Sequence, residues 1–240
     1  MVSAIRRGLV DIIGAARPSI ADPFLPNKIK QGRPEDIREC IGCNICAAWN
    51  NLSAPSRCTQ NPTMGEEWRK KWHPENIAPK KSDSKILIVG AGPAGLEAAL
   101  GLGQRGYQVT LAEARSETGG RVTRESRLPE LNEWVRVRDY RLGQIERRPN
   151  VEIYLESELN VDQILEFGAD HVALATGAIW RNDGVGRNIR FPVPGCSALT
   201  PDDIMDGKRP ATSGSAVTIY DDDHYYMGSV IAELLATKKI

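Results

Sequence analysis

The chain has 240 residues, of which 41% are hydrophobic, enough for one large domain or two modest ones with real cores. Its 31 basic residues balance 31 acidic residues, so charge indicates no nucleic-acid partner, and no apolar run approaches the roughly 20 residues that span a bilayer. Five cysteines, four of them clustered, do not resemble a secreted disulfide scaffold. We therefore expect a soluble cytoplasmic protein that binds neither nucleic acid nor membrane.

The first third of the chain combines short predicted elements with a cysteine-rich segment. We expect a helix over 2–9, a short buried strand over 10–16, then a loop with three prolines and a helix near 23–38. The cysteine segment covers 40–58. A charged, proline-containing stretch follows it to residue 84 and has the composition of a linker.

The sequence changes character at Lys85. SKILIVG predicts a buried strand, PAGLEAALGLGQRG a helix and YQVTLAEA a second strand, which together form a βαβ unit. The elements expected after it are an amphipathic helix with a solvated basic face near 130–148, strands over 151–155, 170–176 and 215–220, and a final helix. This order predicts a doubly wound α/β domain. Because the first and last predicted strands would have no partner, we expect a fragment of a longer protein.

The motif VGAGPAG carries the glycine pattern of a dinucleotide-binding loop. The pattern alone is weak, but here it follows a strand and opens a helix, and a glutamate ends the next strand. The first glycine permits the tight turn, the second lets a pyrophosphate approach, and the third lets the helix pack closely, while the glutamate would accept ribose hydroxyls. The simpler interpretation is a glycine-rich turn with a solvated glutamate. The predicted binding residues are Gly90, Gly92, Pro93, Ala94, Gly95 and Glu113.

Two later motifs favour an FAD-type site over a plain NAD site. ETGGR follows the second strand of the βαβ unit and LATGA closes a later strand, as in the flavoproteins with two dinucleotide-binding domains, which this part of the sequence resembles. That resemblance places Gly120 and Arg121 near the pyrophosphate, and Thr176 and Gly177 near the far end of the site. A strand followed by a turn of small residues would also account for LATGA.

Four cysteines lie within nineteen residues, in CIGCNICAAWNNLSAPSRC. Cys40, Cys43 and Cys46 are spaced C-x2-C-x2-C, and eleven residues separate Cys46 from Cys58. Structural zinc sites usually use two separated C-x2-C pairs, whereas three thiolates so close together suit one face of a 4Fe–4S cubane with a distant fourth ligand. We expect the iron–sulfur cluster, with zinc and a disulfide knot as the alternatives. Cys196 is expected to be an ordinary, half-buried thiol.

Longer stretches resemble one family. GAARPSIADPFLPNKI, RECIGCNIC, CTQNPTMGEEWRKKWHPE and ILIVGAGPAGLEAA resemble, in this order, a run in the trimethylamine/dimethylamine dehydrogenases, whose architecture the 2,4-dienoyl-CoA reductases share. The resemblance implies an FMN-bearing TIM barrel, a 4Fe–4S segment, an FAD- or ADP-binding Rossmann-like domain and a second, NAD(P)-like domain. It also implies that Ala16 and Arg17 contact the FMN phosphate and that the amine-binding catalytic residues lie outside this chain. The implied divisions are 1–33 (last βα element of the barrel), 34–84 (cluster segment and linker), 85–212 (FAD/ADP domain) and 213–240 (start of the NAD(P)-like domain).

The resemblance implies oxidation of a small alkylamine, with electrons passing through FMN and the cluster to a carrier such as electron-transferring flavoprotein, in a homo-oligomer when full length. One alternative is a reductase that takes electrons from NAD(P)H through FAD. The segment DDDHYYMGS (221–229) argues against it, because it lacks close-approach glycines and puts three aspartates where a pyrophosphate would lie. The other alternative is an electron-transfer or nucleotide-binding module without catalysis of its own.

Overall fold

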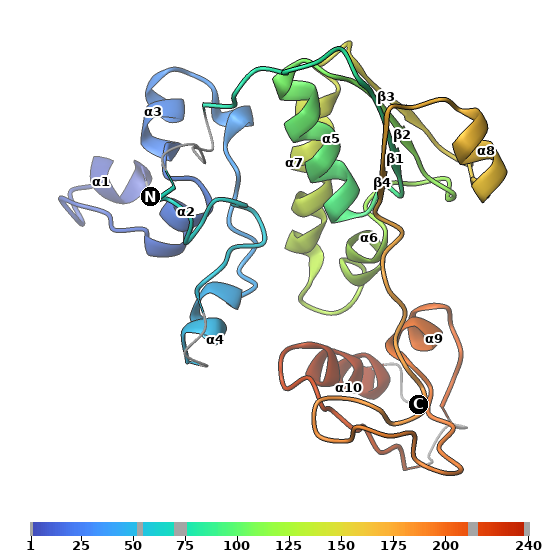
Figure 1. The fold of residues 1–240 in the computed structure, drawn as a ribbon. Coiled ribbons are helices and arrows are strands. Elements are labelled where there is room, and N and C mark those ends of the chain that lie inside the picture. The colour runs from blue at the N-terminus through green and yellow to red at the C-terminus, as the bar shows by residue number, and fades with distance from the viewer. Residues whose placement is uncertain (1, 52–54, 70–75, 211–215, 238–240) are drawn as a thin grey trace.

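The computed structural model describes residues 2–51, 55–69, 76–210 and 216–237. A segment of short helices comes first, a central α/β unit follows, and a loop-rich C-terminal segment ends the chain (Figure 1). No helix in these described ranges is long and apolar enough to cross a membrane.

The central unit is built on a four-stranded parallel sheet in the order β3-β2-β1-β4. Its strands are β1 (Lys85–Val89), β2 (Gln108–Ala112), β3 (Val151–Tyr154) and β4 (His171–Leu174). β1 is buried at four of its five positions because helices cover both of its faces, as is usual for the inner strands of a parallel sheet. The chain order reverses between β1 and β4, and such a switch point opens a crevice at the carboxyl ends of the strands. The predicted doubly wound α/β class is confirmed.

Helices pack on both faces of the sheet (Figure 1). Alternate residues of β1 point to opposite faces: Ile86 and Ile88 pack in the core beside α5 (Pro93–Arg105), and Leu87 packs in a second core toward α8 (Val161–Glu166). α5 begins with proline at its first position and ends at Gly106 in the left-handed conformation (φ +92°), which are the preferred residues for those positions. The remaining elements of this unit are α6 (Arg121–Glu125), η2 (Asn132–Val135) and α7 (Arg136–Ile145).

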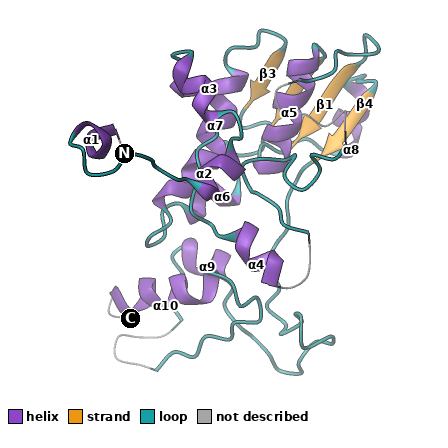
Figure 2. Cartoon of the chain, turned by 90° about the vertical axis from the view of Figure 1, so that its left-hand side faces the viewer, coloured by secondary structure: helices purple, strands orange, loops and turns teal. Residues whose placement is uncertain are grey.

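The N-terminal segment differs from the prediction. It contains α1 (Val2–Arg6), α2 (Ala16–Ala21), α3 (Leu25–Lys30), the short helix η1 (Pro34–Asp36) and α4 (Ile45–Asn51). The strand predicted over 10–16 is wrong: residues 10–15 are irregular and Ile12 is 87% exposed, because no neighbouring strand in the described chain pairs with them. α1 and this irregular stretch stand away from the rest of the molecule (Figure 2). The loop predicted next instead begins with α2, and the helix predicted near 23–38 is divided at Gly32 (φ +67°).

The C-terminal segment holds α9 (Pro201–Met205) and α10 (Met227–Thr237). The predicted final helix is confirmed, but the strand predicted over 215–220 is wrong, because residues 216–220 are irregular and residue 215 lies outside the described ranges. α10 buries one apolar face against the loop after α6; the core there comprises Leu128, Leu131, Met227, Val230, Ile231 and Leu235. The segment is therefore attached to the α/β unit by a small core of its own.

A buried carboxyl group joins the two units. Glu125, at the end of α6, is 5% exposed and accepts a hydrogen bond from the hydroxyl of Tyr226 at 2.8 Å. Burial raises the pKa of this carboxyl above its usual value of 4.5, and the hydrogen bond from Tyr226 only partly offsets that rise. The folded chain thus holds the proton more tightly than the unfolded chain does, so the free energy of unfolding falls as pH rises from about 4.5 through the raised pKa.

We expect Glu125→Gln to raise the Tm by about 2–4 °C at pH 7, because the amide keeps an oxygen for Tyr226 and carries no buried charge. The gain should vanish near pH 4, where the carboxyl is protonated in both states. Thermal unfolding at the two pH values, with the exposed Glu146→Gln as the control, measures this. A gain of the same size at pH 4 would show that the buried charge is not its cause.

Candidate functional site

The glycine loop lies at the switch point of the sheet, between the ends of β1 and β4. Gly90 has φ +102°, and a Cβ there would lie 2.4 Å from the carbonyl oxygen of Ala175, in the segment after β4. A Cβ on Gly95 would lie 1.9 Å from the carbonyl oxygen of Gly90. Both positions therefore require glycine for the packing of strand, turn and helix, as the motif predicted.

Gly92, the second glycine of the motif, is not required by packing within the protein. A Cβ on Gly92 would meet no protein atom within 4 Å, although this residue caps the N-terminus of α5. Pro93 and Ala94 follow in the exposed first turn of that helix. Gly120 (φ +55°) lies opposite, where its own Cβ would be 3.2 Å from the Cα of Gly92. The helix N-terminus thus faces open space beside a second glycine, an arrangement that suits a phosphate group.

Glu113 directly follows β2 beside this loop and is 7% exposed. One carboxylate oxygen accepts from the backbone N–H of Ala91 at 2.7 Å, and the other accepts from that of Arg115 at 3.0 Å. Glu113 thus ties the glycine loop to the end of β2. Each oxygen has a second lone pair for a ribose hydroxyl, and that predicted role stays a prediction.

The remaining predicted nucleotide residues lie along the same edge. Thr176 and Gly177 follow β4 and are exposed, with Gly177 in the left-handed region (φ +81°). The guanidinium of Arg121 donates to the carbonyl oxygen of Ala178 at 2.7 Å and to the carboxylate of Asp202 at 2.9 Å. Arg121 therefore links α6 to α9 and to the chain leaving β4, next to the open space in front of α5.

The clustered cysteines lie on two segments, which meet between Cys43 and Thr59. Cys40, Cys43 and Cys46 lie on the loop before α4 and in its first turn, and the Thr59 hydroxyl, next to Cys58, is 3.2 Å from the sulfur of Cys43. Burial raises the pKa of the Cys58 thiol, and the neighbouring Cys43 and Cys40 add to that rise. The fold thus brings Cys58 into the neighbourhood of Cys43 and Cys40.

Backbone donors face two of these sulfurs. The N–H of Gly42 lies 3.5 Å from the sulfur of Cys40, and the N–H of Gln60 lies 3.4 Å from that of Cys58. Such N–H···S contacts stabilise thiolates and are one of the means by which proteins set the reduction potential of iron–sulfur clusters. Four half-buried thiols, two of them with amide donors, fit the ligand set of a 4Fe–4S cluster.

The cysteine spacing left a disulfide knot and a zinc site as alternatives to the cluster. All five cysteines are free thiols. No group of three or more His, Cys, Asp or Glu side chains within the described ranges is placed to hold a metal ion. A cubane is larger than one ion, so its thiolates stand farther apart than the ligands of zinc. Cys196 is exposed rather than half-buried, because it lies on a surface loop where its sulfur contacts the carbonyl oxygen of Asn182 at 3.5 Å.

Comparison with known proteins places the chain in a family. A family model described as an NAD(P)-binding Rossmann-like domain matches residues 88–143. Dimethylamine dehydrogenase of Hyphomicrobium sp. (strain x) is 48% identical over 98% of this chain and 33% of that protein. The chain belongs to the dimethylamine dehydrogenase family.

Two solved structures agree with this assignment. Histamine dehydrogenase from Rhizobium sp. 4-9 is 56% identical with a TM-score of 0.92, over 100% of this chain and 35% of that one. The 6-hydroxypseudooxynicotine amine oxidase from Pseudomonas geniculata N1 is 58% identical with a TM-score of 0.91, over 99% of this chain and 36% of that one. The chain thus spans about a third of the length of each of these three proteins.

Ala16 and Arg17, which were predicted to contact FMN, are the first two residues of α2. Ala16 is the first residue of that helix and is exposed. The guanidinium of Arg17 donates to the side-chain oxygen of Asn44, which lies between two of the clustered cysteines in the sequence. The structure thus connects Arg17 to the cysteine loop, and its contact with an FMN phosphate stays a prediction.

The sequence did not reveal that the C-terminal segment of the chain reaches the cysteines. The hydroxyl of Tyr225 donates to the carbonyl oxygen of Cys43, and Tyr226 packs on Trp134 with ring centroids 4.4 Å apart. In both views α4 lies toward the segment that carries α9 and α10 (Figures 1 and 2). Only the aspartates of DDDHYYMGS suggested a role, and nothing in the spacing of the tyrosines indicated this contact.

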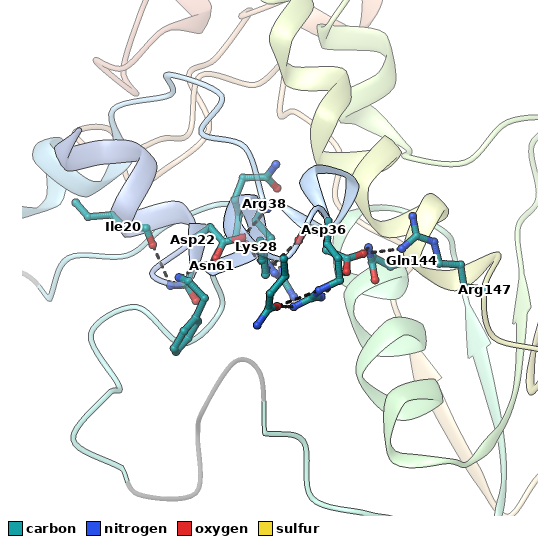
Figure 3. Close-up of polar contacts among 12 residues, drawn as sticks. Ile20, Asp22, Lys28, Asp36, Arg38, Asn61, Gln144 and Arg147 are labelled. Carbon is teal, nitrogen blue, oxygen red and sulfur yellow. Dashed lines mark hydrogen bonds and ion pairs between the residues drawn. The ribbon is translucent and has the colours of Figure 1, made fainter. Parts of the chain in front are cut away.

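The structure also differs from the prediction at α7, whose arginines were expected to form a solvated face. Asp36 of η1 accepts from Gln144 at 3.1 Å and from Arg147 at 2.6 Å (Figure 3). On its other side lies the buried Asp22–Lys28 pair, whose ammonium donates to the carbonyl oxygen of Asp36 at 2.9 Å. Deeper in this interface Arg141 is only 3% exposed. That part of the prediction is wrong, because the N-terminal segment packs onto the polar side of the helix.

Proposed function

We propose that these residues form the cluster-bearing and nucleotide-binding part of an iron–sulfur flavoprotein that oxidises a small alkylamine. The proposal is carried by 48% identity to dimethylamine dehydrogenase across nearly the whole chain. The thiols of Cys40, Cys43, Cys46 and Cys58, with their amide donors, support the cluster. An external carrier such as electron-transferring flavoprotein, a homo-oligomer and a cytoplasmic location belong to the same proposal.

Each part of the chain has its own task in this proposal. A bound 4Fe–4S cluster supplies a centre that exchanges single electrons between FMN and the external carrier. The cysteines hold it, while the amides of Gly42 and Gln60 stabilise the charge on two of the sulfurs. The N-terminus of α5 and the glycine loop bind the pyrophosphate of ADP or FAD, and Glu113 fixes the loop and accepts the ribose hydroxyls. We assign no amine-contacting catalytic residue to this chain.

The aspartates of the C-terminal segment favour this electron path over one that begins at NAD(P)H. Asp221 accepts from the backbone N–H of His224 at 3.0 Å, and a Cβ on Gly228 would lie 2.8 Å from its carboxylate. The amide of Asn188 donates to Asp222 at 2.7 Å. These carboxylates fill and charge the turn before α10, where a nicotinamide dinucleotide would place its pyrophosphate, and they would repel it.

A cofactor inventory tests the proposal. The chain is reconstituted anaerobically with iron and sulfide and purified, and iron, acid-labile sulfide, zinc and released nucleotide are then quantified. About four irons and four sulfides per chain, with ADP, are expected. FAD in place of ADP would move the assignment to the reductase branch. Zinc without sulfide would overturn the cluster and the proposal with it.

We expect Gly92→Ala to weaken ADP binding at least about tenfold while lowering the free energy of unfolding by no more than about 1 kcal/mol, the cost of a poorer N-cap. A Cβ there meets no protein atom, so the fold tolerates it, but the methyl group occupies the approach of the pyrophosphate. Isothermal titration with ADP and thermal unfolding measure the two effects. Gly143→Ala, inside α7 and equally unobstructed, is the control for ADP binding, which it should leave unchanged. Unchanged ADP affinity in Gly92→Ala would rule out this loop as the pyrophosphate site.

A further inference from the structure

Two buried arginines share one carboxylate between the cysteine segment and the α/β unit. Arg38 is 7% exposed and Arg141 is 3% exposed. The Nε of Arg141 lies 2.7 Å from one oxygen of Glu97, and the guanidinium of Arg38 lies 3.2 and 3.3 Å from the two oxygens of the same carboxylate. Two cations thus face one anion, which leaves this group with one net positive charge. Arginine retains its charge even when it is buried.

These guanidinium groups also bind the backbone beside the cysteines. Arg38 donates to the carbonyl oxygen of Gln60 at 2.7 Å, and Arg141 donates to the side-chain oxygen of Gln60 at 2.9 Å and to the carbonyl oxygen of Thr59 at 3.3 Å. The amide of Gln60, which is 1% exposed, donates in turn to the carbonyl oxygen of Glu39 at 3.0 Å. Glu39 and Thr59 adjoin the first and the fourth cysteine, so the arginine pair joins the two cysteine-bearing segments.

The nearby charges do not cancel this excess. Asp22 forms a buried pair with Lys28, and Asp36 pairs with Arg147 and Arg33, so each of these carboxylates already has its own cation. The exposed Glu39 carboxylate pairs with Arg136 at 2.9 Å. The net positive charge of the Arg38–Glu97–Arg141 group therefore acts on whatever the adjacent cysteines hold.

We propose that Arg141, balanced by Glu97, is a positioning residue that raises the reduction potential of the cluster; this rests on the proposed function. Reduction adds one electron, and hence one negative charge, to the cluster. A fixed positive charge in buried surroundings stabilises that reduced state. The same contacts hold Thr59 and Gln60 in place, so the residue combines an electrostatic effect with an anchoring one.

Three variants separate the two effects. Arg141→Gln removes the excess charge and leaves Arg38 paired with Glu97. Glu97→Gln removes the balancing anion and so increases the positive charge. Arg141→Lys keeps the charge and changes the hydrogen-bond geometry. Each is reconstituted in the full chain, and the reduced cluster is followed by electron paramagnetic resonance during an anaerobic redox titration.

We expect the ratio of reduced to oxidised cluster at a fixed potential to fall up to about tenfold in Arg141→Gln, a shift of about 59 mV for one electron. The ratio should rise in Glu97→Gln and stay near wild type in Arg141→Lys. If Arg141→Gln does not retain a cluster, the opposite charge change in Glu97→Gln still decides. Filled clusters with unchanged potentials, or shifts of the same sign in both charge variants, would overturn the inference. A wild-type chain without a cluster would overturn the proposed function instead.

Discussion

The iron content of the reconstituted chain should fall from about four per chain to near zero when Cys58 is replaced by serine. Cys58 is the distant member of the set, and the proposal makes it the fourth ligand of the cubane. Its sulfur faces the N–H of Gln60 at 3.4 Å and lies in the same neighbourhood as Cys43 and Cys40. A hydroxyl is a poor substitute for a thiolate ligand, so assembly should fail. Iron and sulfide analysis with the visible absorption of the cluster measures this.

Cys196→Ser is the matched control, because it exchanges the same atoms at an exposed thiol remote in sequence from the cluster. It should retain full iron and sulfide. Equal loss in both variants would point to general misfolding rather than to ligation. Full iron in Cys58→Ser would exclude Cys58 as a ligand and leave only the three closely spaced cysteines.

A second large effect is expected from Gly95→Ala, which should lower the free energy of unfolding by about 1–3 kcal/mol and abolish ADP binding. A Cβ there would lie 1.9 Å from the carbonyl oxygen of Gly90. That oxygen belongs to the backbone of the turn, so no flexible side chain can move aside. Helix and turn must separate, and the loop that faces the pyrophosphate loses its shape. Urea unfolding and titration with ADP measure the two effects.

Gly101→Ala is the control on the same helix, where a Cβ meets nothing within 4 Å. Alanine is the better helix former, so this variant should be more stable than wild type by about 0.5–1 kcal/mol. The two substitutions are chemically identical and should act in opposite directions. A Gly95→Ala chain as stable as Gly101→Ala would show that the close approach is not required.

The parts predicted well from the sequence are those that depend on local patterns. The βαβ unit from Lys85 to Ala112 follows from an apolar strand, a glycine turn and a helix that ends at glycine, all adjacent in the chain. The doubly wound class and the crevice at the switch point then follow from the order of the elements. The 4Fe–4S cluster expected from the cysteine spacing also rests on a short segment, and it stays a prediction.

The wrong predictions share a physical cause: each depends on contacts with segments that are distant in the chain. Residues 10–16 and 215–220 have strand-like composition, but a strand requires hydrogen bonds from a neighbour, and none pairs with their described residues. The arginines near 136–148 fall at helical spacing, yet the N-terminal segment buries Arg141 on Glu97 and Gln60.

The sequence by itself therefore determined the fold class and the glycine loop, because neighbouring residues suffice to specify both, and it supplied the cluster hypothesis for the cysteines, which stays a prediction. Only the tertiary structure decided what surrounds the cysteines. The contact of Tyr225 with Cys43 and that of Arg141 with Thr59 join residues that are far apart in the chain. Several segments of the chain contribute to the burial and the net charge around the cysteines, so no local sequence pattern can predict them.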